Sequence, residues 1–305
     1  MLDKLILINK PKNEDEMMKL TSVKRIQNIT KPDFITQYKN RNKPVVITEL
    51  TKQWPARKKW NIAYINEIAG DNIVPLYDSK PSQDTKHQHA PEIHMKLKDY
   101  IHLLQKGEND LRLFFYNILT EAPQLIKDFT FPDIGLSLFK KLPVLFLGGK
   151  GAKVQMHFDI DMADILLCHF GGTKRIMLFS PEQTKYMYHV PFSFSSLNKI
   201  DYEHPDYTTY PALKELQGEI TELHHGDVIY IPSGYWHYIM YDDISFSMAL
   251  RAFPRKPKPF FKLLYNLLFI RTTDGLMRKI KGQSWNERNE KLTIPRTHQK
   301  AGIDT

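Results

Sequence analysis

Six short apolar runs between Val144 and Arg251 determine what kind of fold this chain can adopt: VLFLGG (144–149), KVQMHFD (153–159), DILLCHF (164–170), KRIMLFSP (174–181), GDVIYIP (226–232) and ISFSMALR (244–251). Each run is rich in β-branched or aromatic residues, and Gly, Pro or Asp turns separate the runs, as is usual for short strands. Many short strands with little intervening helix are typical of an all-β sandwich or barrel. We therefore predict a mainly β fold.

A long aromatic stretch, Pro181–Leu213, interrupts this strand pattern. Loops of that length inside a compact domain commonly serve as functional lids. Its residues 186–210, together with Tyr235 and Trp236, are therefore candidates for lining the entrance to a site. Packing into the core is the alternative role for each of these aromatic side chains.

Further elements are predicted on the N-terminal side of the six runs. Hydrophobic periodicity and turn residues favour helices at 33–38, 63–69 and 97–105, strands at 44–50 and 111–116, and a loop at 79–92. We expect these α/β elements to flank the β fold. The chain then divides into an N-terminal extension (1–28), a main domain (29–254) and a helical C-terminal segment (255–305).

The C-terminal segment combines a linker with a helix of unusual composition. The linker-like run RKPKP (255–259) is followed by FFKLLYNLLFI (260–270), which predicts a helix that is apolar nearly all round. Such a helix is expected to be buried, either in its own domain or against a second subunit. The residues available for that contact are Phe260, Phe261, Leu264, Leu267 and Leu268.

The positive charge of the chain is concentrated in the same segment. The formal net charge is +9, and residues 251–305 hold thirteen Lys or Arg against four Asp or Glu, which leaves thirty of each sign in the first 250 residues. A basic segment is most often a solvated helical face, although it can contact an acidic partner such as RNA. The charge alone does not make nucleic acid the leading expectation.

The cellular compartment is predicted from three features. Cys168 is the only cysteine, so no internal disulfide can form, which fits a reducing environment. The apolar run near the start of the chain is too short for a secretory signal, and acidic residues follow it. No apolar run approaches the ~20 residues that span a bilayer. We expect a cytoplasmic protein without a membrane partner.

A metal site is suggested by His157 and Asp159, which lie two residues apart on a predicted strand and so share a face. Gln155 lies on that face too, and polar groups in an apolar sheet need partners, which a metal can supply. His-x-Asp also occurs at His204 and at His225, but both lie in turn-like sequence. The alternative is a simple His–Asp hydrogen bond in a polar pocket.

A third ligand would have to come from a distant strand. His237, which follows a Pro–Gly turn in IPSGYWHYI, is favoured modestly by its apolar surroundings. Four other histidines compete with it on spacing alone, namely His169, His189, His224 and His225. Two histidines and one carboxylate on one side of a metal would form the facial triad of non-haem iron oxygenases.

The ordered motifs LGGKGAKVQMHFD (147–159), FGGTKRIMLFSPEQ (170–183), NKIDYEHPDY (198–207) and HHGDVIYIPSGYWHYI (224–239) resemble those of the cupin-like JmjC oxygenases. The subgroup they resemble is that of the asparaginyl hydroxylase factor inhibiting HIF, whose N-terminal signature is similar to NKPVVITELTKQWPARKKW (42–60). The resemblance covers residues 29–251. It implies a double-stranded β-helix, or jelly roll, and identifies the main domain as cupin-like.

The same resemblance implies residue roles. The iron(II) ligands correspond to His157, Asp159 and His237, and the lysine that holds 2-oxoglutarate corresponds to Lys174. A cation is needed there because the buried distal carboxylate of the cosubstrate must be paired. A surface lysine at the start of a strand is the alternative reading of this position.

The sequence departs from the subgroup at three positions that bind the cosubstrate. Phe114 replaces a tyrosine, Val154 replaces a threonine, and Ala249 replaces an asparagine. Losing three hydrogen-bonding groups would weaken 2-oxoglutarate binding by roughly 1 kcal/mol each or more. The residues expected to compensate are Tyr116, Gln155 and Ser247.

The resemblance thus implies a dioxygenase that uses iron(II), 2-oxoglutarate and O2 to hydroxylate a macromolecule, a protein or peptide side chain by preference. An RNA- or ribosome-directed hydroxylase and a non-catalytic metal-binding cupin module are the alternatives. Helical tails in this family often form homodimers, which implies a dimer through residues 258–282.

Overall fold

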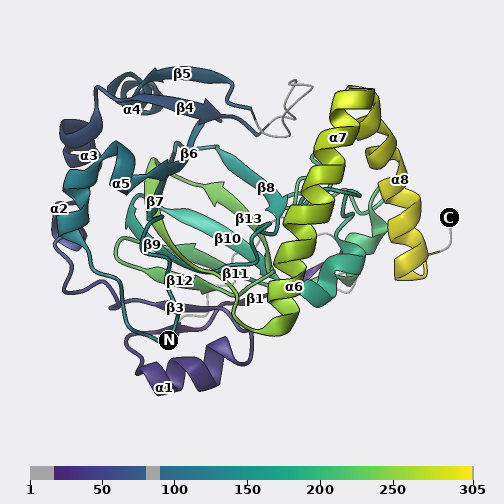
Figure 1. Ribbon diagram of the computed structural model, residues 1–305, viewed down its shortest axis with the longest axis horizontal. Coiled ribbons are helices and arrows are strands. Elements are labelled where there is room, and N and C mark those ends of the chain that lie inside the picture. Colours follow the sequence, from purple (N-terminus) through teal and green to yellow (C-terminus); the bar gives the residue numbers. More distant parts are fainter. Residues whose placement is uncertain (1–16, 80–89, 304–305) are drawn as a thin grey trace.

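Two β-sheets pack against each other in the computed structural model, which describes residues 17–79 and 90–303 (Figure 1). The five-stranded sheet has the order β1 (Lys19–Ser22), β11 (Gln217–Leu223), β10 (Lys174–Phe179), β13 (Trp236–Tyr241), β8 (Lys153–His157). The nine-stranded sheet has the order β2 (Arg25–Ile26), β3 (Val45–Ile47), β12 (Val228–Ile231), β9 (Asp164–Gly171), β14 (Ser245–Ala252), β7 (Val144–Gly148), β6 (Arg112–Asn117), β4 (Ile73–Tyr77), β5 (Ile93–Lys96).

The predicted mainly β fold is confirmed, because all six apolar runs form strands: β7, β8, β9, β10, β12 and β14. The predicted strands at 44–50 and 111–116 are β3 and β6. The sequence pattern did not mark β11 and β13, because glutamates interrupt the first and a Pro–Gly turn leads into the second. The predicted loop at 79–92 lies for the most part outside the described residues.

An apolar core fills the space between the sheets. Ile165, Ile229 and Ala249 contribute from the nine-stranded sheet, and Ile176 and Leu178 contribute from the five-stranded sheet. Side chains on a strand alternate between faces, so every second residue of these strands points into this space. The polar residues of the candidate site lie on the same inner faces.

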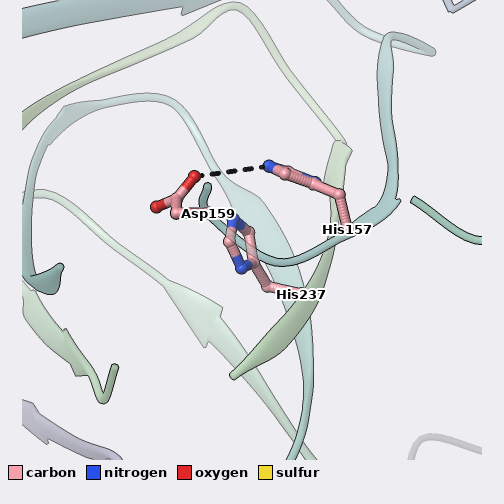
Figure 2. A group of neighbouring side chains, drawn as sticks. All are labelled: His157, Asp159 and His237. Atoms are coloured by element: carbon pink, nitrogen blue, oxygen red, sulfur yellow. Dashed lines mark ion pairs between the residues drawn. The ribbon is translucent and has the colours of Figure 1, made fainter. Parts of the chain in front are cut away.

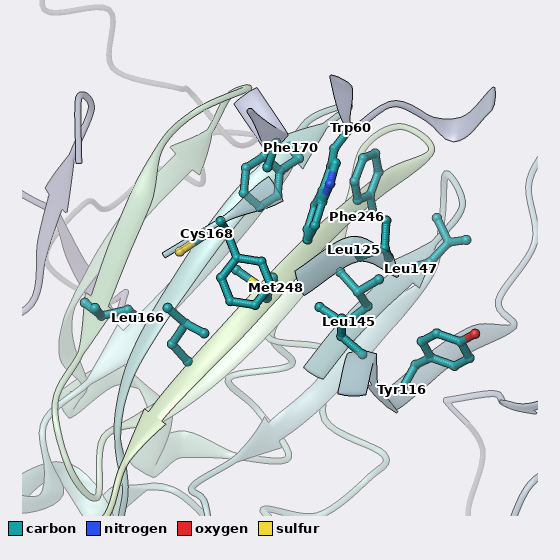
Figure 3. Close-up of a cluster of buried hydrophobic side chains, with 14 of the residues drawn as sticks. Trp60, Tyr116, Leu125, Leu145, Leu147, Leu166, Cys168, Phe170, Phe246 and Met248 are labelled. Atoms are coloured by element: carbon teal, nitrogen blue, oxygen red, sulfur yellow. The ribbon is translucent and has the colours of Figure 1, made fainter. Parts of the chain in front are cut away.

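Short helices cover the outer face of the nine-stranded sheet (Figure 1). They are α2 (Ala56–Lys59), α3 (Ile62–Ala69), α4 (Leu97–Gln105), α5 (Ile118–Glu121) and the 3-10 turn η3 (Pro123–Asp128), while α1 (Lys31–Phe34) continues as a π-helical turn, η2 (Ile35–Lys39). The predicted helices at 33–38, 63–69 and 97–105 are therefore confirmed. Trp60 and Leu125 from this layer pack on Phe170 and Met248 of the sheet (Figure 3), so the burial of large apolar side chains joins the two layers.

The aromatic stretch 181–213 covers the outer face of the five-stranded sheet instead of forming a lid. It contains the 3-10 turn η4 (Pro181–Tyr186) and leads into a second, η5 (Pro211–Glu215). Tyr188 and Tyr202 are completely or almost completely buried, and both belong to one core cluster with Trp236 and Tyr238. For these side chains the core-packing alternative is correct. Tyr235 is also buried, in the core between the sheets.

The C-terminal segment is helical, as predicted, but the apolar side chains of its run 260–270 are not buried. Its elements are α6 (Pro257–Tyr265), the π-helical turn η6 (Asn266–Ile270), α7 (Arg271–Lys281) and α8 (Gln283–Ala301). Phe261 is 66% exposed and Leu268 is 70% exposed. Packing on the flank of the same domain is therefore the wrong alternative for these two side chains.

The C-terminal segment is nevertheless anchored to the rest of the chain. Asn266 is 1% exposed and its amide donates to the Ile160 carbonyl, 3.0 Å away. Contacts of α8 with η4 and η5 attach the far end of the segment. Among the described residues, none of the helices is long and apolar enough to cross a membrane. The division of the chain at residues 28 and 254 stays a prediction, although β1 and β2 of the N-terminal extension already belong to the sheets.

Candidate metal centre

His157 and His237 lie directly opposite each other on the antiparallel strands β8 and β13. Their ring centres are 4.1 Å apart. Asp159 follows two residues after His157, where β8 has ended, and its Oδ1 lies 3.8 Å from His157 Nε2. One ligand atom from each of the three residues lies within 4.8 Å of the others, and the three side chains point toward one another (Figure 2).

Backbone carbonyls set the tautomer of both imidazoles. His157 Nδ1 lies 2.8 Å from the Gln155 carbonyl oxygen, and His237 Nδ1 lies 3.2 Å from that of Tyr235. A carbonyl oxygen only accepts, so each Nδ1 carries the proton and donates it. The lone pair of each Nε2 is then available to a metal, in the usual arrangement of ligating histidines.

The charge state of the triad suits a cation. Burial, assisted by the neighbouring His237, lowers the pKa of His157 to about 4, and burial also lowers the pKa of His237. Burial alone would raise the pKa of Asp159, but the Arg251 guanidinium and the two histidines outweigh it and bring this pKa to about 2. At neutral pH the triad offers two neutral imidazoles and one carboxylate, which is the donor set of non-haem iron(II) sites.

The competing histidines are engaged elsewhere. His169 faces the space between the sheets, but its Nδ1 lies 2.8 Å from Ser247 Oγ and its Nε2 lies 2.9 Å from the Gly172 carbonyl. His189 Nε2 lies 2.7 Å from the Ser193 carbonyl. His224 is on the surface, and both ring nitrogens of His225 meet backbone carbonyls.

The other two His-x-Asp pairs are structural. Asp206 accepts from the backbone of Thr208 and Thr209, which makes a turn. Asp227 forms an ion pair with Arg25 at 2.6 Å.

A second group with metal-ligand chemistry, formed by Asp201, Glu203 and His204, is already neutralised. Lys153 lies 3.1 Å from both of its carboxylates, and Arg175 lies 2.6 Å from Glu203. Ammonium and guanidinium groups therefore occupy the positions that a cation would take.

Lys174 is buried at the start of β10 with an exposed fraction of 1%. It is therefore not the surface lysine of the alternative reading. Its ammonium lies 4.3 Å from the ring centre of Tyr241, and burial lowers its pKa to about 7. Within residues 17–79 and 90–303, no carboxylate forms an ion pair with it. A buried ammonium without a counter-ion is costly, so the site fits an anionic ligand.

The turn before Lys174 is fixed by Gly172. Its φ of +65° is a conformation that other residues adopt with strain, and a Cβ there would lie 2.2 Å from the Ile244 carbonyl oxygen. Glycine at this position thus allows the tight turn from β9 to β10, which directs the Lys174 side chain between the sheets.

Of the three residues expected to compensate for the lost cosubstrate contacts, two lie between the sheets and one does not. Gln155 belongs to the inner face of β8 with His157, and Ser247 is buried beside His169. Tyr116 points outward into the helical layer, where its hydroxyl takes a hydrogen bond from Asn72 at 2.7 Å. A β-bulge at Phe115, with φ of +61°, reverses the alternation that would have put Tyr116 on the face of Phe114.

Two features of the centre escaped the sequence reasoning. The bulge leaves Phe114 44% and Phe115 39% exposed, with Phe146 beside both rings. Arg251 is buried on β14 and bonds to Asp159. The bulge has no clear sequence signal, but Arg251 continues the inward alternation of Ser247 and Ala249 and could have been found from it.

The fold and the site together define a jelly-roll protein with a candidate facial metal centre at the inner faces of its sheets. A family model described as "Cupin-like domain" matches residues 31–253. This match covers most of the chain, so the protein belongs to the cupin-like domain family, and the expected JmjC relationship is confirmed by the names of its relatives.

The relatives differ in what they are named for. "JmjC domain-containing protein D" of Dictyostelium discoideum is 26% identical over 79% of this chain and 58% of its own length. "Lysine-specific demethylase 8" of Xenopus tropicalis is 28% identical over 71% of this chain and 49% of its length. "tRNA wybutosine-synthesizing protein 5" of Gallus gallus is 25% identical over 76% of both chains. The chain thus spans about half the length of the first two of these curated relatives.

The triad predicts one divalent-cation site per chain. We expect Mn²⁺ or Co²⁺ to bind with a stoichiometry of one, and His157→Ala or His237→Ala to weaken binding by more than about 100-fold, because a lost ligand should cost more than the 10–100-fold typical of outer-shell changes. Isothermal titration calorimetry of the metal-free protein measures both. His204→Ala, in the second group, is the matched control and should bind normally. Equal losses of metal affinity in all three variants would contradict the assignment of His157 and His237 as ligands.

Proposed function

We propose that this protein is an iron(II)- and 2-oxoglutarate-dependent oxygenase that hydroxylates a macromolecular substrate. The proposal is carried by the pairing of an open His157–Asp159–His237 triad with a buried ammonium, Lys174, that has no counter-ion among the described residues. Relatives named as a lysine-specific demethylase and as a tRNA wybutosine-synthesizing protein support a macromolecular substrate.

The triad and Lys174 have separate roles in the proposed reaction. His157, Asp159 and His237 would hold iron(II) and leave the remaining positions to ligands, and Lys174 would pair with the distal carboxylate of 2-oxoglutarate. When bound, iron(II) and 2-oxoglutarate supply the oxidising chemistry, in which O2 delivers one oxygen atom to the substrate and one to succinate while CO2 is released.

Gln155 and Ser247 are proposed as further cosubstrate contacts. Ser247 Oγ is shared with His169, and a hydroxyl can accept one hydrogen bond while donating another. Tyr116 is not included, because its hydroxyl is bonded to Asn72 and to the Glu121 carbonyl on the outer side of the sheet.

A protein side chain is the substrate that we favour. The exposed ring of Phe115 lies 5.9 Å from the guanidinium of Arg251, which contacts Asp159, and the exposed ring of Phe114 packs against Phe115. They therefore offer an apolar wall next to the centre, where they can exclude water from a bound side chain.

RNA is the second candidate substrate. The basic C-terminal segment supports it, as does the relative named for tRNA wybutosine synthesis.

A homodimer through residues 258–282 is also proposed. Seven large hydrophobic side chains of the segment are at least 42% exposed: Phe260, Phe261, Tyr265, Leu268, Phe269, Leu276 and Ile280. Exposed apolar side chains that gather on one helical segment in this way indicate an interaction site. A second copy of the same helices would cover it in an isologous contact. The expected cytoplasmic location stays a prediction.

Turnover tests the oxygenase directly. With iron(II), ascorbate and O2, we expect the protein to convert 2-oxoglutarate to succinate, and mass spectrometry should find one added oxygen atom in a fraction of either cell protein or total tRNA. His237→Ala is the inactive control. Metal binding without any succinate would contradict the oxygenase and support the non-catalytic cupin module, and oxygen added to tRNA alone would make RNA the substrate.

The pKa of Lys174 predicts how 2-oxoglutarate affinity depends on pH. The ammonium is charged below its pKa of about 7 and neutral above it, and a bound carboxylate raises that pKa. Affinity should therefore be highest below pH 7 and fall by up to about tenfold per pH unit as the pH rises above 7. Anaerobic titration of the Mn²⁺ protein measures this. Lys174→Met should remove both the affinity for 2-oxoglutarate and its pH dependence, whereas the control Lys153→Met should keep both. An affinity that does not change with pH in the unaltered protein would contradict the role of Lys174.

Charge placed in the exposed apolar surface should break the dimer. We expect the unaltered protein to have twice the chain mass by light scattering, and Phe261→Glu or Leu268→Glu to give monomers, because a buried unpaired carboxylate is costly. Ile73→Glu is the matched control, since Ile73 is 69% exposed but lies on β4. A monomeric unaltered protein would rule the dimer out.

A further inference from the structure

Arg251 links the metal centre to a second carboxylate. It lies on the inner face of β14, is 5% exposed, and donates to two aspartates of the loop that follows β8. Nε and Nη2 bind Asp161 at 3.0 and 2.6 Å, and Nη2 also binds Asp159 Oδ2 at 2.9 Å. This planar fork fixes the position of Asp159 relative to Asp161.

The two oxygens of Asp159 have different surroundings. Oδ2 is taken by Arg251, while Oδ1 faces His157 Nε2 at 3.8 Å. A carboxylate can bind a metal through one oxygen or through both, and the choice changes how many positions remain for other ligands. Occupation of Oδ2 by a guanidinium favours a bond through Oδ1 alone.

Little else orients this side chain. The backbone of the loop is held by Met162, whose N–H donates to the Asp159 carbonyl at 3.1 Å, and by Asn266, which binds the Ile160 carbonyl. Among the described residues, Arg251 is the only hydrogen-bond donor to the Asp159 carboxylate. The side chain lies beyond the last residue of β8, so the strand pairing does not fix it either.

We propose that Arg251 is a positioning residue of the metal centre, which holds Oδ2 of Asp159 so that Oδ1 alone is presented to the metal. This proposal rests on the metal site of the proposed function. Arg251 would touch neither the metal nor the substrate, and would act only through Asp159, with Asp161 holding the guanidinium in place.

A positioning role of Arg251 and a purely electrostatic role predict opposite effects of its removal on metal affinity. Arg251 is a cation close to a cation site, so removing it would strengthen metal binding if charge alone mattered. If orientation matters, removing it should weaken binding by about 10–100-fold, as for other groups that orient metal ligands. Lysine keeps the charge but lacks the fork that bridges two carboxylates, so Arg251→Lys separates the two effects.

The experiment measures Co²⁺ affinity and the visible spectrum of the Co²⁺ protein for the unaltered chain, Arg251→Met and Arg251→Lys. We expect both variants to bind Co²⁺ about 10–100-fold more weakly and to show a changed spectrum, because the ligand oxygens around the ion change. Asp161→Asn should cause a smaller loss in the same direction. Where Arg251→Met does not fold, the double variant Asp161→Asn/Arg251→Met removes one charge of each sign and serves in its place.

Arg175 provides a matched control. It is also partly buried between two carboxylates, with Asp242 at 2.7 Å and Glu203 at 2.6 Å, but these are not the candidate ligands. Arg175→Met should keep its Co²⁺ affinity within about twofold, as for an independent site. Folded Arg251 variants that bind Co²⁺ as tightly as the unaltered protein, or more tightly, would overturn the proposal. Absence of binding in the unaltered protein would instead overturn the metal site itself.

Discussion

The register between β8 and β13 is the constraint on which the candidate site depends. It places His157 opposite His237, and a slip by one residue would turn one of the imidazoles to the other face of the sheet. Apolar packing holds this register, because Met156 and Phe158 alternate with the first histidine, and Trp236 and Tyr238 flank the second, all four in the core under the aromatic stretch 181–213. The stretch 181–213, a lid candidate by its length, therefore stabilises the geometry of the centre from the outer face of the five-stranded sheet.

The charges next to the metal centre form a connected set that does not include Lys174. Asp159 and Asp161 are matched by Arg251, and the two imidazoles of the triad are neutral at physiological pH because burial lowers their pKa values. Lys174 stands apart as a buried cation whose contact is the ring of Tyr241. A protein interior tolerates such a group when a ligand completes it, and a dicarboxylate that reaches from the metal to Lys174 would do so.

Sequence alone predicted the strands and suggested two candidate ligands, because both depend on alternation within one run. His157 and Asp159 share a strand face by spacing, whereas His237 was one of five candidates until the resemblance to a family ordered the motifs. Tyr116 was misplaced by a bulge at Phe115, since one extra residue reverses the faces that alternation assigns. Sequence alone also left open what covers the apolar side chains of α6, because an apolar helix predicts burial without saying which surface will cover it.

The most direct test of the central claim is a crystal structure of the protein with Mn²⁺ and 2-oxoglutarate, prepared without oxygen. We expect Mn²⁺ on Nε2 of His157, Nε2 of His237 and Oδ1 of Asp159, with the distal carboxylate of 2-oxoglutarate on the Lys174 ammonium. Mn²⁺ bound elsewhere, such as at Asp201 and Glu203, or a cosubstrate that leaves Lys174 without an anion, would contradict it.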